Sequence, residues 1–130
     1  MDGIAGMITV FHLNHDLDRK KRHGVIFPLL IGDDETPRAV AAKQLFEEGG
    51  YHEAAKVEGT DLNYAFRVTN NLENSWSLEP VAGVTPTAPG FEEFKGKQYG
   101  YKSSEIGDIF RVEETGKMYV VDTFGFTELP

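Results

Sequence analysis

Runs of apolar and β-branched residues mark the strands expected in this chain. Met7–Leu13 is rich in such side chains and predicts a first strand. The apolar run Val25–Ile31 is compatible with a second strand, but Pro28 would remove a ladder donor and push it toward a sheet edge or a break. Tyr51–Glu58 predicts a further strand. The residues expected to share one face of it are Tyr51, Ala55 and Val57.

Two segments with helical periodicity carry start and stop signals. In the first, Thr36 can cap the free amides, Pro37 suits the first helical position, and Gly49-Gly50 supplies the stop. Its expected apolar stripe is Pro37, Val40, Ala41 and Leu45. The second begins at a cap of Thr60 or Asp61 and ends at Asn70-Asn71. Its apolar positions are Leu62, Ala65, Phe66 and Thr69.

The C-terminal quarter predicts a β-hairpin. Ile109–Glu113 and Met118–Thr123 are β-rich and flank a short connection that contains Gly116. Phe124 and Phe126 lie on either side of Gly125, and we expect both rings to anchor the C-terminus by burying apolar area.

The segment 72–101 predicts a long loop, because Pro80, Pro86 and Pro89 interrupt any regular element. Aromatic residues concentrate in it. They are Trp76, Phe91, Phe94, Tyr99 and Tyr101. Interfaces favour aromatic anchors inside a polar rim, which makes these residues candidates for partner binding. The alternative is that the loop folds back and buries its own rings in a satellite core.

Together these elements predict an α+β fold, in which a single layer of two helices packs on a mainly antiparallel sheet that ends in the C-terminal hairpin. A length of 130 residues suits one domain, 1–130. Residues 1–6 are featureless, and we expect them to be a short leader or a cloning remnant.

Composition and charge narrow the function classes. Cysteine is absent, which excludes disulfides, thiol nucleophiles and cysteine-ligated zinc. The net charge of −8 argues against direct binding to nucleic-acid phosphates, although the run Arg19–Arg22 could make a local anion contact if it is not simply a solvated loop. No apolar run is long enough for a membrane span, so we expect no membrane association.

Histidines and carboxylates near the end of the first predicted strand are the best metal candidates. His12 and His15 lead this group, but the spacing matches no common site, and surface histidines are the alternative interpretation. No Gly-x-Ser-x-Gly elbow and no phosphate-cradling glycine loop occurs. We therefore expect no catalytic residue and no cofactor.

Two blocks of the C-terminal region resemble a known family. Lys102–Ile109 (KSSEIGDI), followed by Tyr119–Phe126 (YVVDTFGF), is similar to the YodL-like domain. The upstream run Ala55–Asn71, with Ser75-Trp76 after it, is similar to small proteins of bacteriophages and plasmids. The resemblance covers roughly residues 51–126, and family members often have Arg-Ser where this chain has Lys102-Ser103. It implies an origin in a mobile element and a location in the host cytoplasm, but no activity.

The polar residues of these blocks also have architectural explanations. Ser103 and Ser104 can bond nearby backbone, Gly107 allows a positive φ, and Asp108 can accept backbone donors. For Asp122, among apolar neighbours, we expect a structural carboxylate tied to loop amides.

Three functional hypotheses follow. The first is a non-enzymatic interaction module that binds an unidentified host protein through the aromatic loop. The second is an acidic DNA mimic that occupies the basic groove of a DNA-binding or defence enzyme. Its candidate carboxylates are Asp33–Glu35, Glu47, Glu48, Glu53 and Glu58. The third is a small metal- or ligand-dependent enzyme around His12 and His15. The sequence leaves the oligomeric state open.

Overall fold

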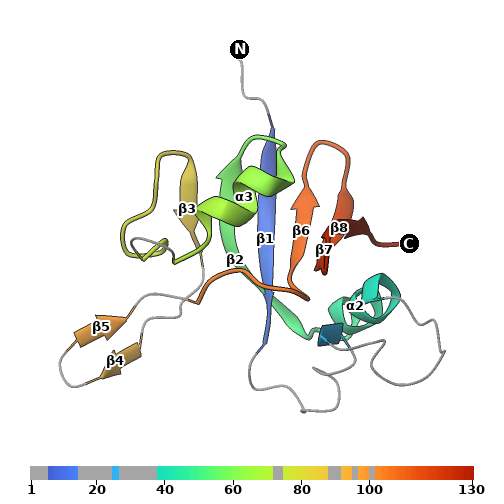
Figure 1. The fold of residues 1–130 in the computed structure, drawn as a ribbon, viewed down its shortest axis with the longest axis horizontal. Coiled ribbons are helices and arrows are strands. Elements are labelled where there is room, and N and C mark those ends of the chain that lie inside the picture. The colour runs from blue at the N-terminus through green and yellow to red at the C-terminus, as the bar shows by residue number, and fades with distance from the viewer. Residues whose placement is uncertain are drawn as a thin grey trace.

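The fold is built on a six-stranded antiparallel sheet with the strand order β3-β2-β1-β6-β7-β8 (Figure 1). The computed structural model describes residues 6–14, 25–26, 38–71, 75–87, 92–94, 97–99 and 102–130. In chain order the strands of the sheet are β1 Met7–Leu13, β2 Tyr51–Glu58, β3 Val84–Pro86, β6 Ile109–Val112, β7 Lys117–Asp122 and β8 Gly125–Glu128. The first strand, the Tyr51–Glu58 strand and the C-terminal hairpin are confirmed, as is the α+β class.

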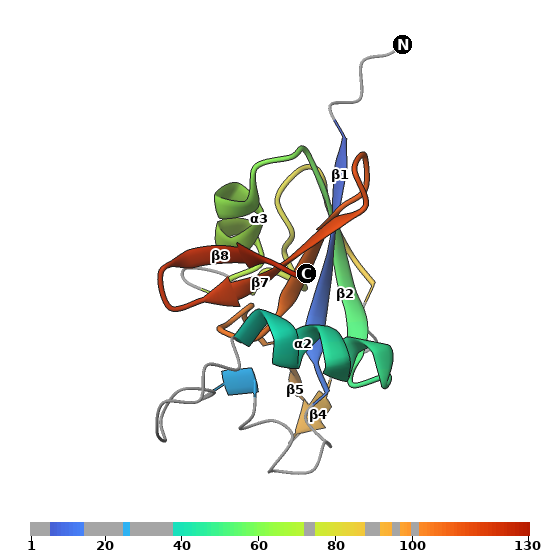
Figure 2. The same ribbon diagram turned by 90° about the vertical axis from the view of Figure 1, so that its right-hand side faces the viewer.

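The two helices lie on opposite faces of this sheet. Neighbouring residues of a strand point to opposite faces. Phe110 belongs to the core beneath α3 (Leu62–Val68), whereas Ile109 belongs to the core beneath α2 (Arg38–Glu47). Figure 2 shows α3 beside the upper part of β1 and α2 across the lower part of the view. The expectation of a single helical layer is therefore wrong, because the apolar residues of β1, β6 and β7 supply two buried faces rather than one.

Helix α3 follows its predicted signals. Asp61 is the N-cap, and its carboxylate accepts the N–H groups of Asn63 and Tyr64 at 3.0 and 3.3 Å. The helix ends at Thr69, whose hydroxyl donates to the Ala65 carbonyl at 2.8 Å.

Helix α2 ends as predicted, but it buries a different stripe. Gly49 has φ +85, and the Gly50 N–H donates to the Leu45 carbonyl at 2.9 Å, which closes the helix. The buried residues are Ala39, Ala42 and Leu45, whereas Val40 is 41% exposed. Small alanines let the helix approach the sheet closely, and a pattern based on residue hydrophobicity alone favours the larger Val40. The predicted cap at Thr36-Pro37 lies outside the described residues.

A β-bulge in β2 changes which residues share a face. Val10 of β1 pairs with Ala55, but Phe11 pairs with Glu53, so Ala54 is the extra residue. Ala55 and Val57 face the α3 core, whereas Tyr51, on the other side of the bulge, packs in the α2 core. The predicted common face for Tyr51, Ala55 and Val57 is thus wrong.

The segment predicted as a long loop contains regular structure. β3 pairs with β2 at the edge of the sheet, and Pro86 is its last residue. A proline is tolerated there because an edge strand has no partner on its outer side. Further along, β4 (Glu92–Phe94) and β5 (Lys97–Tyr99) form a separate two-stranded ladder (Figure 1).

Two other expectations concern segments described only in part. Val25 and Ile26 are helical rather than extended, and the Val25 side chain is buried in the α2 core, while the rest of Val25–Ile31 lies outside the described residues. The described part of the chain holds no helix long and apolar enough to cross a membrane.

Candidate functional site

Asp108 is the centre of a buried polar cluster that joins the segment 102–108 to β1. Its side chain is fully buried. One carboxylate oxygen accepts the Leu13 N–H at 2.9 Å, and the other accepts the Glu105 N–H at 2.8 Å and the Lys102 ammonium at 3.2 Å. Gly107, with φ +98, makes the turn that brings Asp108 back toward Glu105. The predicted roles of Gly107 and Asp108 are confirmed.

His12 extends this cluster toward α3 through two hydroxyl groups. His12 Nε2 lies 2.9 Å from Ser104 Oγ, which lies 2.8 Å from Thr69 Oγ1. The Thr69 hydroxyl also lies 2.8 Å from the Ala65 carbonyl, and either Thr69 or Ser104 can donate the hydrogen bond between their two hydroxyls. Which of His12 and Ser104 donates the hydrogen bond between them depends on the tautomer of the ring.

Ser104, His12 and Asp108 resemble a catalytic triad in composition only. In a triad the nucleophile contacts one ring nitrogen and the carboxylate the other. Here Asp108 Oδ2 lies 3.8 Å from Nε2, the nitrogen that already contacts Ser104. All three side chains are buried, with Ser104 the most exposed at 3%. A substrate has no access to this buried serine.

The electrostatics of the cluster fit a structural role. Burial, with the nearby charges of Lys102 and His52, lowers the pKa of His12 to about 2, so the ring stays neutral. Burial also raises the pKa of Asp108 to about 6, against the opposing effects of Lys102 and two backbone N–H donors. These groups hold the segment 102–108 in place beside β1.

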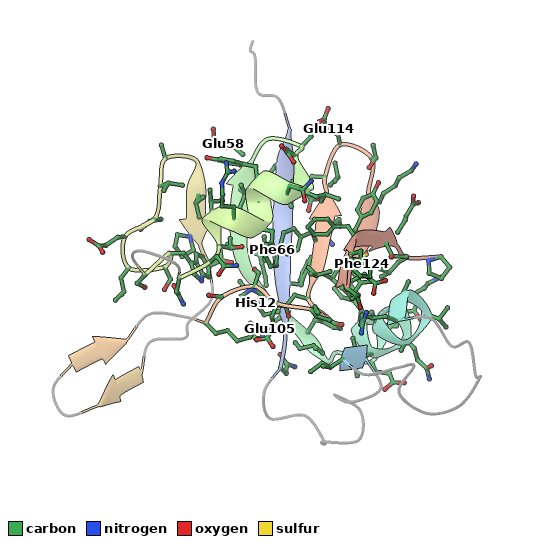
Figure 3. The ribbon with its side chains drawn as sticks, in the orientation of Figure 1. His12, Glu58, Phe66, Glu105, Glu114 and Phe124 are labelled. Carbon is green, nitrogen blue, oxygen red and sulfur yellow. The ribbon has the colours of Figure 1, made fainter. Side chains whose placement is uncertain are left out.

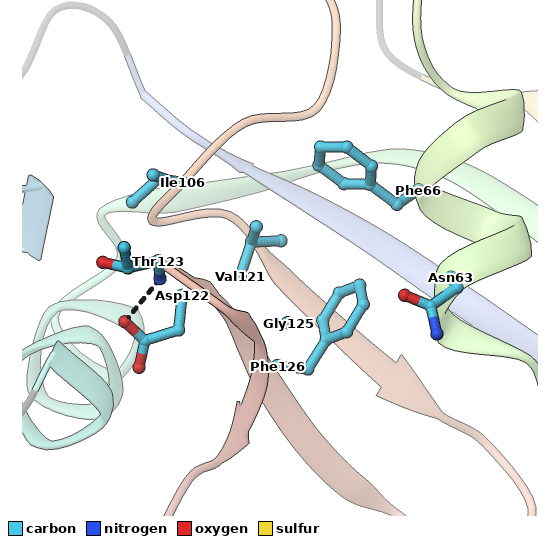
Figure 4. Close-up of a pocket in the computed structure, with 8 residues that line it drawn as sticks. All are labelled: Asn63, Phe66, Ile106, Val121, Asp122, Thr123, Gly125 and Phe126. Atoms are coloured by element: carbon cyan, nitrogen blue, oxygen red, sulfur yellow. Dashed lines mark hydrogen bonds between the residues drawn. The ribbon is translucent and has the colours of Figure 1, made fainter.

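An open pocket of about 290 Å³ lies between α3, the segment 102–108 and the β7–β8 hairpin (Figure 4). Its apolar lining comes from Phe66 on α3, Ile106, and Val121 and Phe126 of the hairpin. Asn63, Asp122 and Thr123 supply its polar lining. The buried cluster positions the pocket wall that Ile106 forms. Ile106 lies between Glu105 and Asp108, and the Glu105 N–H donates to the Asp108 carboxylate.

Phe124 is at the tip of the hairpin beside this pocket. Its side chain is 94% exposed, whereas the other exposed large apolar side chains of the described residues are 37% to 49% exposed. Thr123 and Phe124 form the connection between β7 and β8, where Asp122 pairs with Gly125, and Gly125 has φ +82. The expectation that Phe124 anchors the C-terminus is wrong, because the turn projects its ring into solvent. Phe126 does pack against the α3 core.

Asp122 clamps the hairpin to α2. Its carboxylate accepts the Thr123 N–H at 2.8 Å and the Thr127 hydroxyl at 2.7 Å, and it forms an ion pair with Arg38. Partial burial opposes ionisation, but these donors together lower the pKa of Asp122. The predicted structural carboxylate tied to loop amides is confirmed, and it fixes the position of the pocket wall.

The aromatic residues predicted to bind a partner do not form one surface in the described part of the chain. Trp76 is 3% exposed and belongs to the α3 core, and its Nε1 donates to the Lys102 carbonyl at 2.8 Å. Its assignment as an exposed anchor is wrong because the chain folds back and buries it. Phe94 and Tyr99 belong to the β4–β5 ladder. Phe91 and Tyr101 lie outside the described residues.

Only one of the two candidate metal ligands lies within the described residues. His12 is the second-last residue of β1 and its side chain is buried, so the alternative of a surface histidine is wrong. His15 lies outside the described residues. Within the described ranges, no group of three or more His, Asp or Glu side chains is arranged to hold a metal ion.

The carboxylates proposed for DNA mimicry are dispersed where they are described. Glu47 and Glu48 are at the C-terminal end of α2, and Glu58 is at the opposite end of β2 from Tyr51 (Figure 3). Glu53 pairs with Lys56 at 3.8 Å. Asp33–Glu35 lie outside the described residues.

Sequence reasoning missed the surface formed by Ile106, Phe124 and the pocket, here called the hairpin surface. One signal was present: Asp122-Thr-Phe-Gly125 between two β-rich runs fits a two-residue turn, which would have placed Phe124 at an exposed tip. The pocket itself depends on contacts between α3 and β8 that no local pattern specifies. No known protein family, curated protein or solved structure matches this chain.

Proposed function

We propose that this chain is a non-enzymatic protein-interaction module that binds its partner through the hairpin surface. The observation that carries the proposal is Phe124, a large aromatic side chain 94% exposed at a turn, next to an open pocket with apolar walls. Leaving an aromatic ring in water gives up the free energy of its burial. Exposed aromatic residues beside a pocket are the usual anchors of protein interfaces.

The chemistry of the described residues supports a binding role over a catalytic one. The polar residues with catalytic potential, His12, Ser104 and Asp108, are buried and use their hydrogen bonds to hold the segment 102–108. The hairpin surface contributes apolar side chains, one amide, one hydroxyl and one carboxylate already paired with Arg38. Such a surface offers shape and apolar contact rather than a reactive group.

The resemblance of residues 51–126 to the YodL-like domain and to small phage and plasmid proteins supports a host protein as the partner. A mobile element acts inside a host cell, and a small non-enzymatic protein can act there by occupying a surface of a host factor. The net charge of −8 favours a partner with a basic surface.

A capture experiment with matched variants tests this proposal. The tagged protein, its Phe124→Ser variant and a Val81→Ser control are incubated with bacterial lysate, and bound proteins are identified. Val81 is 49% exposed and lies just before β3, at the other edge of the sheet, so its variant loses a comparable exposed apolar group elsewhere.

We expect one protein to be captured by wild type and control and lost with Phe124→Ser. Equal capture by all three proteins would contradict the assignment of the hairpin surface. Capture of a DNA-handling enzyme that is insensitive to Phe124→Ser and abolished by high salt would favour the acidic DNA mimic instead.

A further inference from the structure

Strand β8 presents an open edge of the sheet directly beside the pocket. In an antiparallel pair, residues that bond to the neighbouring strand alternate with residues that point away from it. The Leu129 N–H donates to the Met118 carbonyl of β7 at 2.8 Å, so the N–H and C=O groups of Phe126 and Glu128 point outward. In the described part of the chain no strand lies beyond β8, which is the end of the sheet order.

The two edges of the sheet are not equivalent. β3 is three residues long and ends in Pro86, a residue that blocks further pairing. β8 contains no proline and no lysine, and its sequence is Gly-Phe-Thr-Glu. Natural sheets protect free edges with prolines, charged side chains and short strands, so β8, which has one charged residue and no proline, is less protected than β3.

The pocket lies on the face of β8 where a neighbouring strand would project its side chains. Phe126 both lines the pocket and carries one of the outward backbone groups of β8. A strand added beside β8 alternates its side chains between the two faces, so one of them meets the pocket next to Phe126. A volume of about 290 Å³ is at the lower limit of roughly 300–1,000 Å³ for drug-sized ligands, and it suits one apolar side chain.

The acidic side chains around this edge favour a partner segment with basic residues. Glu128 points to the same face as Phe126, because the two are separated by one residue along β8. Glu105 precedes Ile106 at the pocket, and its side chain is 56% exposed although Lys102 approaches it to 3.4 Å. Together with the net charge of −8, these carboxylates attract lysine and arginine and repel an acidic segment.

We propose that β8 accepts an extended peptide segment of the partner as an additional strand, with one aromatic or branched apolar residue in the pocket and basic residues on either side of it. Main-chain hydrogen bonds to Phe126 and Glu128 would supply affinity, and the pocket with its acidic surroundings would supply specificity. This inference rests on the proposed function, since it names the class of partner for the same surface.

Fluorescence polarisation with synthetic peptides tests the inference on the full chain. The probe is a short labelled peptide with a central phenylalanine and alternating threonine and lysine on both sides. Two matched peptides replace the phenylalanine by alanine or every lysine by glutamate. We expect the alanine peptide to bind about tenfold more weakly or worse, from the lost burial of one ring, and the glutamate peptide to show no binding.

Two variants of Glu128 separate edge pairing from charge. Glu128→Pro removes the outward N–H but keeps the Leu129 bond to β7, and Glu128→Gln keeps the N–H but removes the charge. We expect about tenfold weaker binding with Glu128→Pro and a smaller, salt-dependent loss with Glu128→Gln. Circular dichroism of both variants verifies that the sheet is intact.

Several outcomes would overturn the inference. Binding that is unchanged by Glu128→Pro would exclude strand addition, and equal binding of the alanine peptide would exclude the pocket. A wild-type dimer in light scattering that becomes a monomer with Glu128→Pro would show that a second copy occupies the edge. If no peptide binds but Phe124→Ser still abolishes capture from lysate, the proposed function stands and only this partner class is wrong.

Discussion

Replacing Asp108 by asparagine would test whether burial or hydrogen bonding dominates the buried polar cluster. Asp108 is fully buried, which disfavours its ionised form, yet three donors point at its oxygens: the N–H groups of Leu13 and Glu105 and the Lys102 ammonium. Asparagine keeps the shape and one acceptor oxygen, but its NH₂ group takes the place of the other oxygen and faces at least one of these donors. We therefore expect Asp108→Asn to be destabilising, by an amount that depends on pH.

The sign and size of this dependence follow from the raised pKa. Burial raises the pKa of Asp108 from 3.8 to about 6, so between these values the folded state binds more protons than the unfolded state. A pKa raised in the folded state contributes stability at low pH that is lost as pH rises through about 6. At about 1.4 kcal/mol for each tenfold change in proton affinity, the loss is about 3 kcal/mol. Asp108→Asn lacks this contribution. The amount by which its free energy of unfolding falls below that of the wild type should therefore shrink by about 3 kcal/mol from below pH 4 to pH 7.

Urea denaturation at a series of pH values measures the effect, with the fluorescence of Trp76, the single tryptophan, as the probe. A lowered pKa such as that of His12 also causes a loss of stability in acid. His12 is present in the wild type and in Asp108→Asn, so its effect cancels when the two free energies of unfolding are subtracted. Glu105→Gln is the control, since it removes an exposed carboxylate next to the same lysine and should change stability by less than about 0.5 kcal/mol. If the loss of unfolding free energy caused by Asp108→Asn grows with pH, the prediction is wrong. That result would mean that the three donors stabilise the ionised carboxylate by more than burial destabilises it.

Three other changes test separate parts of the fold. Trp76→Phe keeps a ring in the core but deletes the donor to the Lys102 carbonyl, so we expect a loss of about 1 kcal/mol in urea denaturation followed by circular dichroism; no loss would show that this bond contributes nothing net. Gly107→Ala should lower the Tm more than Gly116→Ala: both glycines have positive φ, but only at Gly107 would the new Cβ meet a side chain, 3.0 Å away in β1. Equal Tm values would contradict the contact. Phe124→Ser should change the free energy of unfolding by less than about 0.5 kcal/mol, since the ring is almost fully exposed, and a larger loss would place that ring in the core.

Elements whose signals are local could be predicted from the sequence. Asp61 at a helix cap, Gly49-Gly50 at a helix end and the glycine-containing turn between β6 and β7 each act within a few residues. The roles of Gly107 and Asp108 were predictable for the same reason, since both serve a turn formed by the segment 102–108 itself.

Features that depend on distant contacts were beyond this reasoning. The helices cover different faces because Ile109 and Phe110 both meet apolar partners from elsewhere in the chain. The bulge at Ala54 reverses which β2 side chains face each side of the sheet, and no residue pattern within Tyr51–Glu58 predicts it. Trp76 looked like an interface anchor because it lies in a segment that is rich in aromatic residues and interrupted by prolines. Its ring nevertheless donates to the carbonyl of Lys102, 26 positions away.

The candidate site divides in the same way. A two-residue turn at Thr123-Phe124 was recognisable, and with it the exposure of Phe124. The pocket was not, because Phe66 and Ile106 reach it from two segments whose relative position is set by the sheet and the buried cluster.

The burial of β1 and β6 on both faces has a consequence for how the molecule opens. Six consecutive residues of β1, from Ile8 to Leu13, are buried, and β6 contributes to the cores beneath both helices. Neither helix can separate from the sheet without exposing a side of these two strands, so the two halves should lose structure together. In hydrogen exchange, the amides of β1 and β6 should be the slowest of the molecule, whereas those of the edge strands β3 and β8 exchange through small local openings.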